Sequence, residues 1–258
     1  MNITLLLLDA LNLIRRVYAA QPGDDGPDRV NDALTTSVRS LQRALQECRP
    51  THAMCVFDGH TPGWRHRLYP TYKAGRSPMP DDLNSQMNRF REAFSEIGVR
   101  SVCFPTLEAD DVIATLAVKA ASRNGNIVIL STDRMFLQLV SDRIIVRDHF
   151  HRRNMDQTYV NEKLHVRPDQ LVDFFALTGY ATNNIPGVAG VGAKTAAKLL
   201  NELNDLDTIL SVAYTMKGTL GKKLSEHAEE ARLSRELVDL KDDMDLGLNL
   251  KSFRYTSR

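Results

Sequence analysis

Short apolar segments that alternate with amphipathic ones are the feature that most constrains how this chain folds. Five segments are expected to form strands: 3–8, 53–57, 99–104, 127–130 and 144–146. Between them, apolar residues recur at helical spacing, for example from Val30 to Leu45. Strands that alternate with helices in this way form parallel sheets covered on both faces. The pattern therefore predicts an α/β fold with a parallel sheet.

The strand pattern stops after about residue 155, and the remaining sequence has helical periodicity. We expect an α/β domain over residues 1–157 and a helical region over residues 158–258. Apolar residues make up 43% of the chain and charged residues 25%, a composition that excludes intrinsic disorder.

No segment is apolar over the roughly 20 residues that span a bilayer, and no membrane partner is expected. The first apolar run ends at Asp9 without a basic leader. Three scattered cysteines match neither a disulfide framework nor zinc spacing. These features predict a reduced, cytoplasmic protein.

The charges are balanced overall, with 33 Lys and Arg against 32 Asp and Glu, but they are unevenly distributed. Residues 59–80 contain no carboxylate, but they contain Arg65, Arg67, Lys73 and Arg76. Residues 174–201 also lack carboxylates. Two local basic surfaces favour an anionic partner that approaches from particular sides, although chance clustering explains either stretch alone.

Carboxylates follow the predicted strands at the edge where parallel sheets bind ligands. Asp9, Asp58 and Asp133 come after the first, second and fourth strands, and Glu108, Asp110 and Asp111 begin the helix after the third. Six converging carboxylates repel one another unless cations neutralise them, and oxygen ligands favour Mg²⁺ or Mn²⁺. Each acid alone is also a common helix cap or first-turn residue. We therefore predict a divalent metal site from the whole set.

The segment 185–200 is the least ambiguous motif. Gly190 and Gly192 flank Val191 in a predicted tight hairpin, and a helix with Lys194 and Lys198 on one face begins after them. Glycines and a helix N-terminus let backbone N–H groups approach a phosphate. The alternative is an ordinary glycine-rich turn between two helices.

The sequence resembles bacterial 5′-nucleases of the flap endonuclease family, most closely the short stand-alone form called exonuclease IX. The resemblance covers nearly the whole chain, and the segments that carry it are 8–13, 56–59, 72–76, 108–112, 131–133 and the hairpin. It implies a PIN-like nuclease domain followed by a helical region with a helix-three-turn-helix that grips duplex DNA. The implied activity is Mg²⁺-dependent hydrolysis of DNA with a 5′ flap or overhang. No obligate protein partner is implied.

The resemblance also assigns roles by position. The first metal site corresponds to Asp9, Asp58, Glu108, Asp110, Asp111 and Asp133, with Asp110 also catalytic. Lys73 and Arg76 correspond to basic residues that contact the scissile phosphate. K⁺ in relatives is bound by main-chain carbonyls that correspond here to Leu177, Thr178, Pro186, Val188 and Val191. The hairpin residues expected to hold a duplex phosphate are Gly190, Val191, Gly192, Ala193, Lys194 and Thr195.

Three positions depart from the family pattern. Met135, Tyr180 and Asn183 stand where the family usually has aspartates that serve a second metal. Thioether, phenol and amide groups supply no negative charge near neutral pH. We therefore expect one protein-held Mg²⁺, with Mn²⁺ able to substitute, and a second that depends on substrate phosphates.

Two other functions remain open from the sequence. Loss of the second subsite is compatible with a DNA-structure-binding protein that has lost catalysis. A PIN-type ribonuclease shares the carboxylate cluster but has no need of a duplex-gripping hairpin. His149 and His151 are expected on a basic surface with Arg147, Arg152 and Arg153, or on a solvated edge strand.

Overall fold

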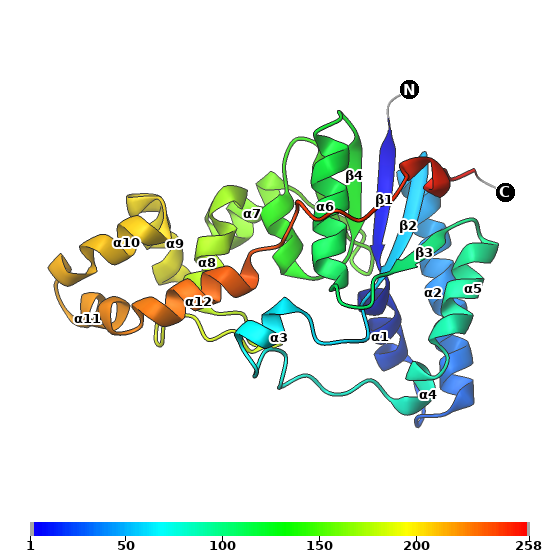
Figure 1. Cartoon of the computed structure of the whole chain (residues 1–258), viewed down its shortest axis with the longest axis horizontal. Helices are drawn as coiled ribbons and strands as arrows, with labels where there is room; N and C mark the ends of the chain where they lie inside the picture. Colours follow the sequence, from blue (N-terminus) through cyan, green and yellow to red (C-terminus); the bar gives the residue numbers. More distant parts are fainter. Residues whose placement is uncertain (1–2, 257–258) are drawn as a thin grey trace.

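The computed structural model describes residues 3–256 and contains one six-stranded sheet (Figure 1). Its order is β3-β2-β1-β4-β5-β6. The strands are β1 (Thr4–Asp9), β2 (His52–Phe57), β3 (Arg100–Cys103), β4 (Asn126–Leu130), β5 (Ile144–Asp148) and β6 (Arg153–Met155). The first five are parallel, which confirms the predicted strands, and the short β6 runs antiparallel to β5.

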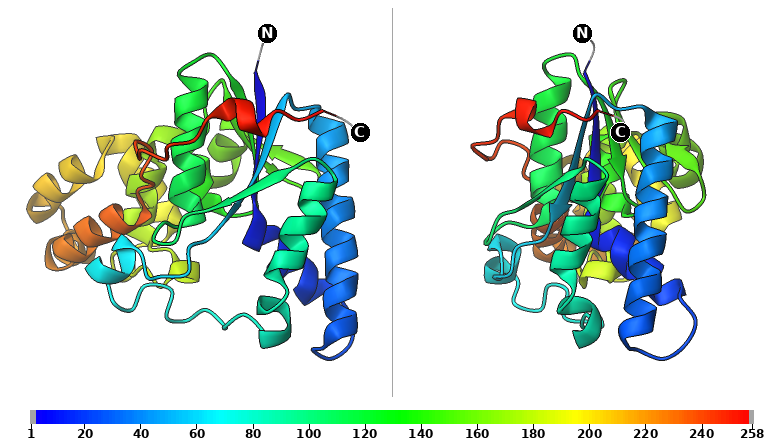
Figure 2. Two further views of the ribbon diagram at one scale, coloured as in Figure 1. Left: turned by 45° about the vertical axis from the view of Figure 1, so that its right-hand side comes forward. Right: turned by 90° about the vertical axis from the view of Figure 1, so that its right-hand side faces the viewer.

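Helices cover both faces of the sheet (Figure 2). This part contains α1 (Ala10–Ala20), α2 (Pro27–Cys48), α3 (Trp64–Leu68), α4 (Asp81–Asn84), α5 (Met87–Glu96), α6 (Ala109–Ala121) and the 3₁₀ helix η1 (Arg134–Leu139). Successive residues of β1 enter opposite cores: Leu6 and Leu8 pack with α1, α2 and α5, whereas Leu5 and Leu7 pack with α6. The uniformly apolar run is therefore explained by burial on both faces.

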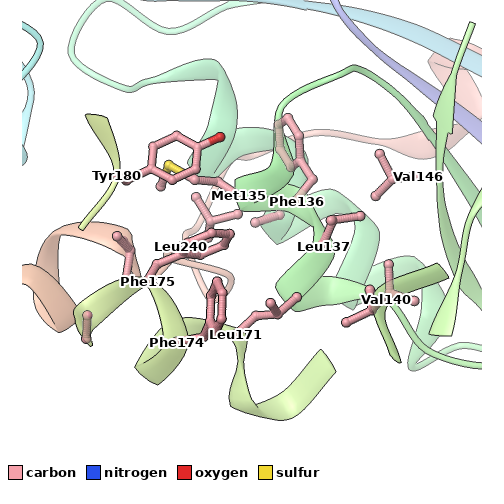
Figure 3. Packing of buried hydrophobic residues seen from close by; sticks show 14 of the residues in the cluster. Met135, Phe136, Leu137, Val140, Val146, Leu171, Phe174, Phe175, Tyr180 and Leu240 are labelled. Atoms are coloured by element: carbon pink, nitrogen blue, oxygen red, sulfur yellow. The ribbon is translucent and has the colours of Figure 1, made fainter. Parts of the chain in front are cut away.

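The remaining chain is helical, as expected. It contains α7 (Gln157–Leu164), η2 (Pro168–Gln170), α8 (Leu171–Thr178), η3 (Ala181–Asn183), α9 (Ala193–Leu203), α10 (Leu206–Val212), η4 (Ala213–Thr215), α11 (Thr219–Glu226), α12 (Ala228–Val238) and η5 (Leu250–Phe253). Phe174 and Phe175 of α8 pack near Met135 and Phe136 of η1 (Figure 3). The two parts thus share one hydrophobic core.

The chain returns to the sheet after α12 (Figure 1). Tyr255 N donates a 2.9 Å hydrogen bond to Thr51 O, and the backbone of Arg254 forms an isolated antiparallel β-bridge with His52 of β2. The last residues described therefore pack on the α/β part. Within residues 3–256, every helix is too short or too polar to cross a membrane.

The β5–β6 turn differs from the expected basic surface at one residue. Arg147 and Arg152 both pair with Glu47, at 2.6 and 2.8 Å, and His151 is largely exposed. His149 is instead buried, with 8% of its surface exposed. The expectation that His149 lies at the surface is wrong, because its ring packs against Phe150, with ring centroids 4.0 Å apart.

Candidate active site

The strand order reverses at β1, which lies between β2 and β4. Asp9 ends β1, Asp58 follows β2, and Asp133 follows β4. Parallel strands on either side of such a reversal leave a crevice at their carboxyl ends. The topology therefore brings these three aspartates to one edge of the sheet.

Each strand-end aspartate also caps a helix. Asp9 Oδ1 accepts a 3.1 Å hydrogen bond from Asn12 N, and its Oδ2 accepts one from Ser131 Oγ at 2.9 Å. Asp58 Oδ1 accepts from the N–H of the first residue of α6 at 2.8 Å. Asp133 Oδ1 likewise accepts a hydrogen bond from Met135 N, in η1, at 2.8 Å. Capping and ligand binding are compatible, because no hydrogen bond from residues 3–256 reaches the second oxygen of Asp58 or Asp133.

Asp110 is the most informative side chain in the site. It lines a cavity of about 370 Å³ with Asp9, Asp58 and Asp133. It is 8% exposed, and no residue in the described chain donates a hydrogen bond to its carboxylate or pairs with it. Burial raises the pKa of Asp110 well above its ordinary value, and the neighbouring aspartates add to this despite Lys73. Burial and Asp58 likewise raise the pKa of Asp9 to about 7.

These residues fit a partly hydrated divalent ion. All four lining acids offer oxygen ligands, which hard cations prefer. Within residues 3–256, no three His, Cys, Asp or Glu side chains are grouped closely enough to hold a metal ion together. Mg²⁺ usually keeps several waters and binds through one or two carboxylates. A cavity lined by spaced acids suits that mode of binding.

Glu108 lies next to the cavity but does not line it. Its Oε2 accepts hydrogen bonds from Lys73 Nζ at 2.8 Å and from the Tyr72 hydroxyl at 3.1 Å. Burial raises the pKa of Glu108, but Lys73 and Arg65 outweigh it and hold this pKa below its usual range. Glu108 therefore remains ionised and orients Lys73, rather than facing the other acids directly.

The expectation that Asp111 joins the carboxylate cluster is wrong. Asp111 is completely buried, and both its oxygens accept from the guanidinium of Arg65, at 2.8 and 2.9 Å. Trp64 Nε1 and Lys241 N donate to it as well. The next residue on a helix points about 100° away, so Asp111 faces α3 and the segment after α12. A buried arginine 46 positions earlier carries no local sequence signal.

Lys73 and Arg76 lie at the cavity wall, in the segment that connects α3 to α4 (Figure 1). Lys73 N donates to Asn183 O at 2.8 Å, and Arg76 Nε donates to Thr182 O at 3.1 Å. Arg76 Nη2 also donates to Asn183 Oδ1. Lys73 has a φ of 59°, a left-handed conformation that is uncommon for lysine. The helical region therefore holds both cations in place.

Sequence reasoning missed two further cations in the cavity. Arg15 and Arg16 of α1 line it, and Arg15 Nη2 donates to Ser77 O at 2.7 Å. Their position just after Asp9 is a usable signal, because a helix that begins at a strand end carries its first turns past the cavity.

The three positions without carboxylates come together in the structure. Asn183 Nδ2 donates to Met135 Sδ at 3.0 Å and to the Tyr72 hydroxyl at 3.3 Å. The Tyr180 hydroxyl donates to Asp133 Oδ1 at 2.6 Å, and burial raises the pKa of Tyr180. Neutral side chains therefore satisfy one another beside Asp133.

The hairpin has the shape expected of a phosphate-binding turn. Gly190 has a φ of 78°, and Gly192 caps α9 without any side-chain hydrogen bond to the cap. A Cβ on Gly192 meets nothing within 4 Å, whereas one on Gly187 lies 2.1 Å from Gly179 N. Glycine at 187 is thus required by the fold, and glycine at 192 leaves open space outside the helix N-terminus. Phosphate binding at residues 190–195 stays a prediction.

The fold and the site together define an α/β nuclease with an appended helical DNA-binding region. Residues 4–165 match the 5′-3′ exonuclease N-terminal resolvase-like domain, and residues 166–258 match the 5′-3′ exonuclease C-terminal SAM fold. The chain therefore belongs to the 5′-3′ exonuclease family.

Curated relatives match along the whole chain. The flap endonuclease Xni of Photobacterium profundum is 43% identical over 257 residues, which is 99% of this chain and 98% of that protein. Flap endonuclease Xni of Vibrio cholerae is 39% identical over 259 residues, which is 100% of this chain and 98% of that protein.

Solved structures share the fold at low identity. The bacteriophage T5 D15 protein, crystallised with metal ions, has a TM-score of 0.75 at 22% identity, covering 92% of this chain and 90% of that one. The catalytic core of Rad2 in complex with DNA substrate has a TM-score of 0.61 at 15% identity, covering 95% of this chain and 79% of that one. At these identities the likeness establishes the fold.

Proposed function

We propose that this protein is a metal-dependent flap endonuclease and 5′-3′ exonuclease that hydrolyses phosphodiester bonds in DNA with a 5′ flap or overhang. The observation that carries the proposal is Asp110, a buried carboxylate without a partner among three further aspartates. Such a group needs a cation to be stable in its ionised form. The names of the curated relatives support the flap substrate.

Asp9, Asp58, Asp110 and Asp133 would hold Mg²⁺, or Mn²⁺ in its place, one or two of them directly and the others through its waters. When bound, Mg²⁺ activates water for hydrolysis and neutralises charge at the phosphate. Lys73 and Arg76 are positioned to bind the phosphate oxygens and to stabilise the charge that develops on them. Despite burial, Asp110, Tyr72 and Glu108 raise the pKa of Lys73 above its ordinary value, so Lys73 is charged when the phosphate arrives.

A second Mg²⁺ would depend on substrate. Met135, Tyr180 and Asn183 offer it no carboxylate, and Arg76 already provides a cation hydrogen-bonded to Asn183. The phosphate itself must therefore supply the missing negative ligands.

The helical region would bind the duplex next to the cleavage site. Backbone N–H groups of residues 190–195 would hold a phosphate, with Lys194 beside them. We also propose K⁺ at the turn, bound by the carbonyls of Leu177, Thr178, Pro186, Val188 and Val191. Residues 177 and 188 are adjacent across this turn, where Val188 N donates to Leu177 O at 2.8 Å.

A second candidate is a DNA-structure-binding protein without catalysis, which the neutral cluster at Met135, Tyr180 and Asn183 favours. A labelled 5′-flap substrate in a Mg²⁺ titration separates the two functions, with Asp110→Asn as the matched control. Mg²⁺-dependent cleavage that Asp110→Asn abolishes supports the nuclease. Binding without cleavage at any Mg²⁺ or Mn²⁺ concentration supports the second candidate, and cleavage of single-stranded RNA in preference to flap DNA contradicts both.

A further inference from the structure

Arg65 of α3 is a completely buried arginine that the proposed mechanism does not use. Its guanidinium donates to both oxygens of Asp111 in α6, at 2.8 and 2.9 Å. Its Nε also donates to Leu237 O at 2.8 Å, and its Nη2 donates to Asp239 O at 3.0 Å. One side chain therefore joins α3 to α6 and to the end of α12 (Figure 1).

The partners of Arg65 are themselves held from several sides. Lys241 N donates to Asp111 Oδ1 at 3.1 Å, so the segment after α12 binds both members of the ion pair. Trp64 Nε1 donates to the other oxygen of Asp111 at 2.9 Å. The Cζ of Arg65 lies 4.4 Å from the centre of the Trp64 ring. These contacts fix the guanidinium in one position.

The same guanidinium contacts Glu108, the residue before α6. Arg65 Nη1 lies 3.7 Å from Glu108 Oε2, the oxygen that also accepts from Lys73 Nζ at 2.8 Å. One carboxylate oxygen thus contacts two cations, of which Arg65 is buried and Lys73 lines the catalytic cavity. A buried carboxylate is stable only when cations or donors compensate its charge. Arg65 therefore holds in place the carboxylate that orients Lys73.

We propose that Arg65 is a positioning residue for cleavage, which acts through Glu108 to hold the Lys73 ammonium where it meets the phosphate. Arg65 has no exposed surface with which to contact DNA. Its planar fork reaches Asp111, two carbonyls and Glu108 together, whereas a lysine ammonium presents its donors from a single point. The inference rests on the proposed function, because it concerns the cation proposed to bind the phosphate.

The test compares binding and cleavage of a 5′-flap DNA by the wild type and by Arg65→Lys, which keeps a cation beside Asp111 but lacks the fork. The single-turnover rate constant with Mg²⁺ should fall at least about tenfold, because alignment of a charged donor matters most in the transition state. Affinity for the same DNA without Mg²⁺, by fluorescence anisotropy, should stay within about twofold, because uniform binding is not affected.

A double-mutant cycle with Lys73→Ala separates positioning from general destabilisation. If Arg65 acts through Lys73, Arg65→Lys should change the rate constant by less than about threefold once Lys73 is absent. All rates are measured well below the melting temperature of each variant. The emission of Trp64, the only tryptophan in the chain, reports that temperature.

A second variant removes the ion pair altogether. Arg65→Met/Asp111→Leu replaces it with apolar side chains, a change that often leaves stability unchanged or higher. It should show the same loss of rate, the same affinity and the same dependence on Lys73. The matched control is Leu41→Ala, which truncates a buried side chain of α2 in the core on the other face of the sheet. It should lower the melting temperature but leave the rate constant per folded molecule unchanged.

The outcomes separate this inference from the proposed function. A wild-type rate constant in both Arg65 variants would overturn the inference. A loss of rate that persists in full without Lys73, or failure of both variants to fold, would show that Arg65 serves the fold alone and would also overturn it. A loss of affinity as large as the loss of rate would assign Arg65 to DNA binding instead. Absence of flap cleavage by the wild type would overturn the proposed function, and this inference with it.

Discussion

The hydroxyl of Tyr180 donates a 2.6 Å hydrogen bond to Oδ1 of Asp133, and so joins the helical region to the carboxyl edge of the sheet. Met135, next but one to Asp133, accepts a hydrogen bond from Asn183 at 3.0 Å. Neutral donors therefore occupy the side of Asp133 where relatives are expected to carry further acids. This arrangement makes the number of metal ions in the free protein a question that experiment can answer.

The first prediction is that the free protein binds one divalent ion tightly and gains another only with DNA. Substituting Met135→Asp, Tyr180→Asp and Asn183→Asp together should create a second DNA-independent site and raise cleavage at low Mg²⁺. Without metal, the added buried charges should destabilise the triple variant by several kcal/mol. Isothermal calorimetry with Mg²⁺ counts the sites.

Tyr180→Phe is the matched control for the triple variant, because it removes the hydrogen bond to Asp133 without adding charge. It should cost about 1–2 kcal/mol of stability and create no new site. Two comparably tight Mg²⁺ sites in the wild-type protein before DNA is added would contradict the prediction.

The second prediction concerns Asp110. Asp110→Asn should abolish tight Mg²⁺ binding and cleavage while leaving duplex affinity largely intact. It should also stabilise the metal-free fold, because it removes a charge that repels three aspartates, and each 1 kcal/mol gained raises the melting temperature by about 2–4 °C. Thermal unfolding with and without Mg²⁺ measures both effects. A variant as strongly stabilised by Mg²⁺ as the wild type would show that Asp110 is not a ligand.

The third prediction concerns the hairpin. Gly192→Val should fold normally, because a Cβ there meets nothing within 4 Å, but it should obstruct a phosphate that approaches the backbone. Duplex affinity should fall equally for every sequence, since phosphate contacts position DNA without reading it. Lys194→Ala should lower the salt slope by about one unit.

Gly187→Ala serves as the contrasting variant for the hairpin, because its Cβ clashes with Gly179 and should destabilise the fold itself. Anisotropy with several duplex sequences is the measurement. A loss that depends on sequence would indicate base readout and contradict the phosphate assignment.

The fourth prediction is a pH dependence from His149. Because burial lowers its pKa to about 4 from an ordinary 6.5, the unfolded chain binds more protons between these values. The contribution of His149 to the free energy of unfolding is therefore fully present above about pH 6.5. It decreases as the pH falls towards 4, with a loss of about 2 kcal/mol by about pH 5. His149→Leu should lack this pH dependence. Urea unfolding of both proteins at several pH values gives the difference, and parallel curves would refute it.

Much of the fold could be predicted because its signals are local. β1, β2, β4 and β5 each contain a short apolar run, and Asp9, Asp58 and Asp133 lie at or shortly after the ends of β1, β2 and β4. Adjacent parallel strands bring such residues together without further information. The signal from the hairpin glycines is also local, because Gly187 and Gly190 have positive φ values that their turn requires.

Residues whose roles depend on distant partners could not be predicted. Asp111 looks equivalent to Asp110 in the sequence, but Arg65 neutralises it in the buried core. His149 looks like part of a basic surface, but Phe150 and α2 enclose it.

The sequence alone therefore determined the α/β order, the strand-end acids and the hairpin, because periodicity and turn chemistry act over a few residues. Only the tertiary structure decided which acids face the cavity, which cations border it and which groups remain without partners. Those outcomes depend on burial and on contacts between segments 46 to 130 positions apart, such as Arg65 and Lys241 with Asp111. Electrostatic effects of this kind become large only where packing has excluded water.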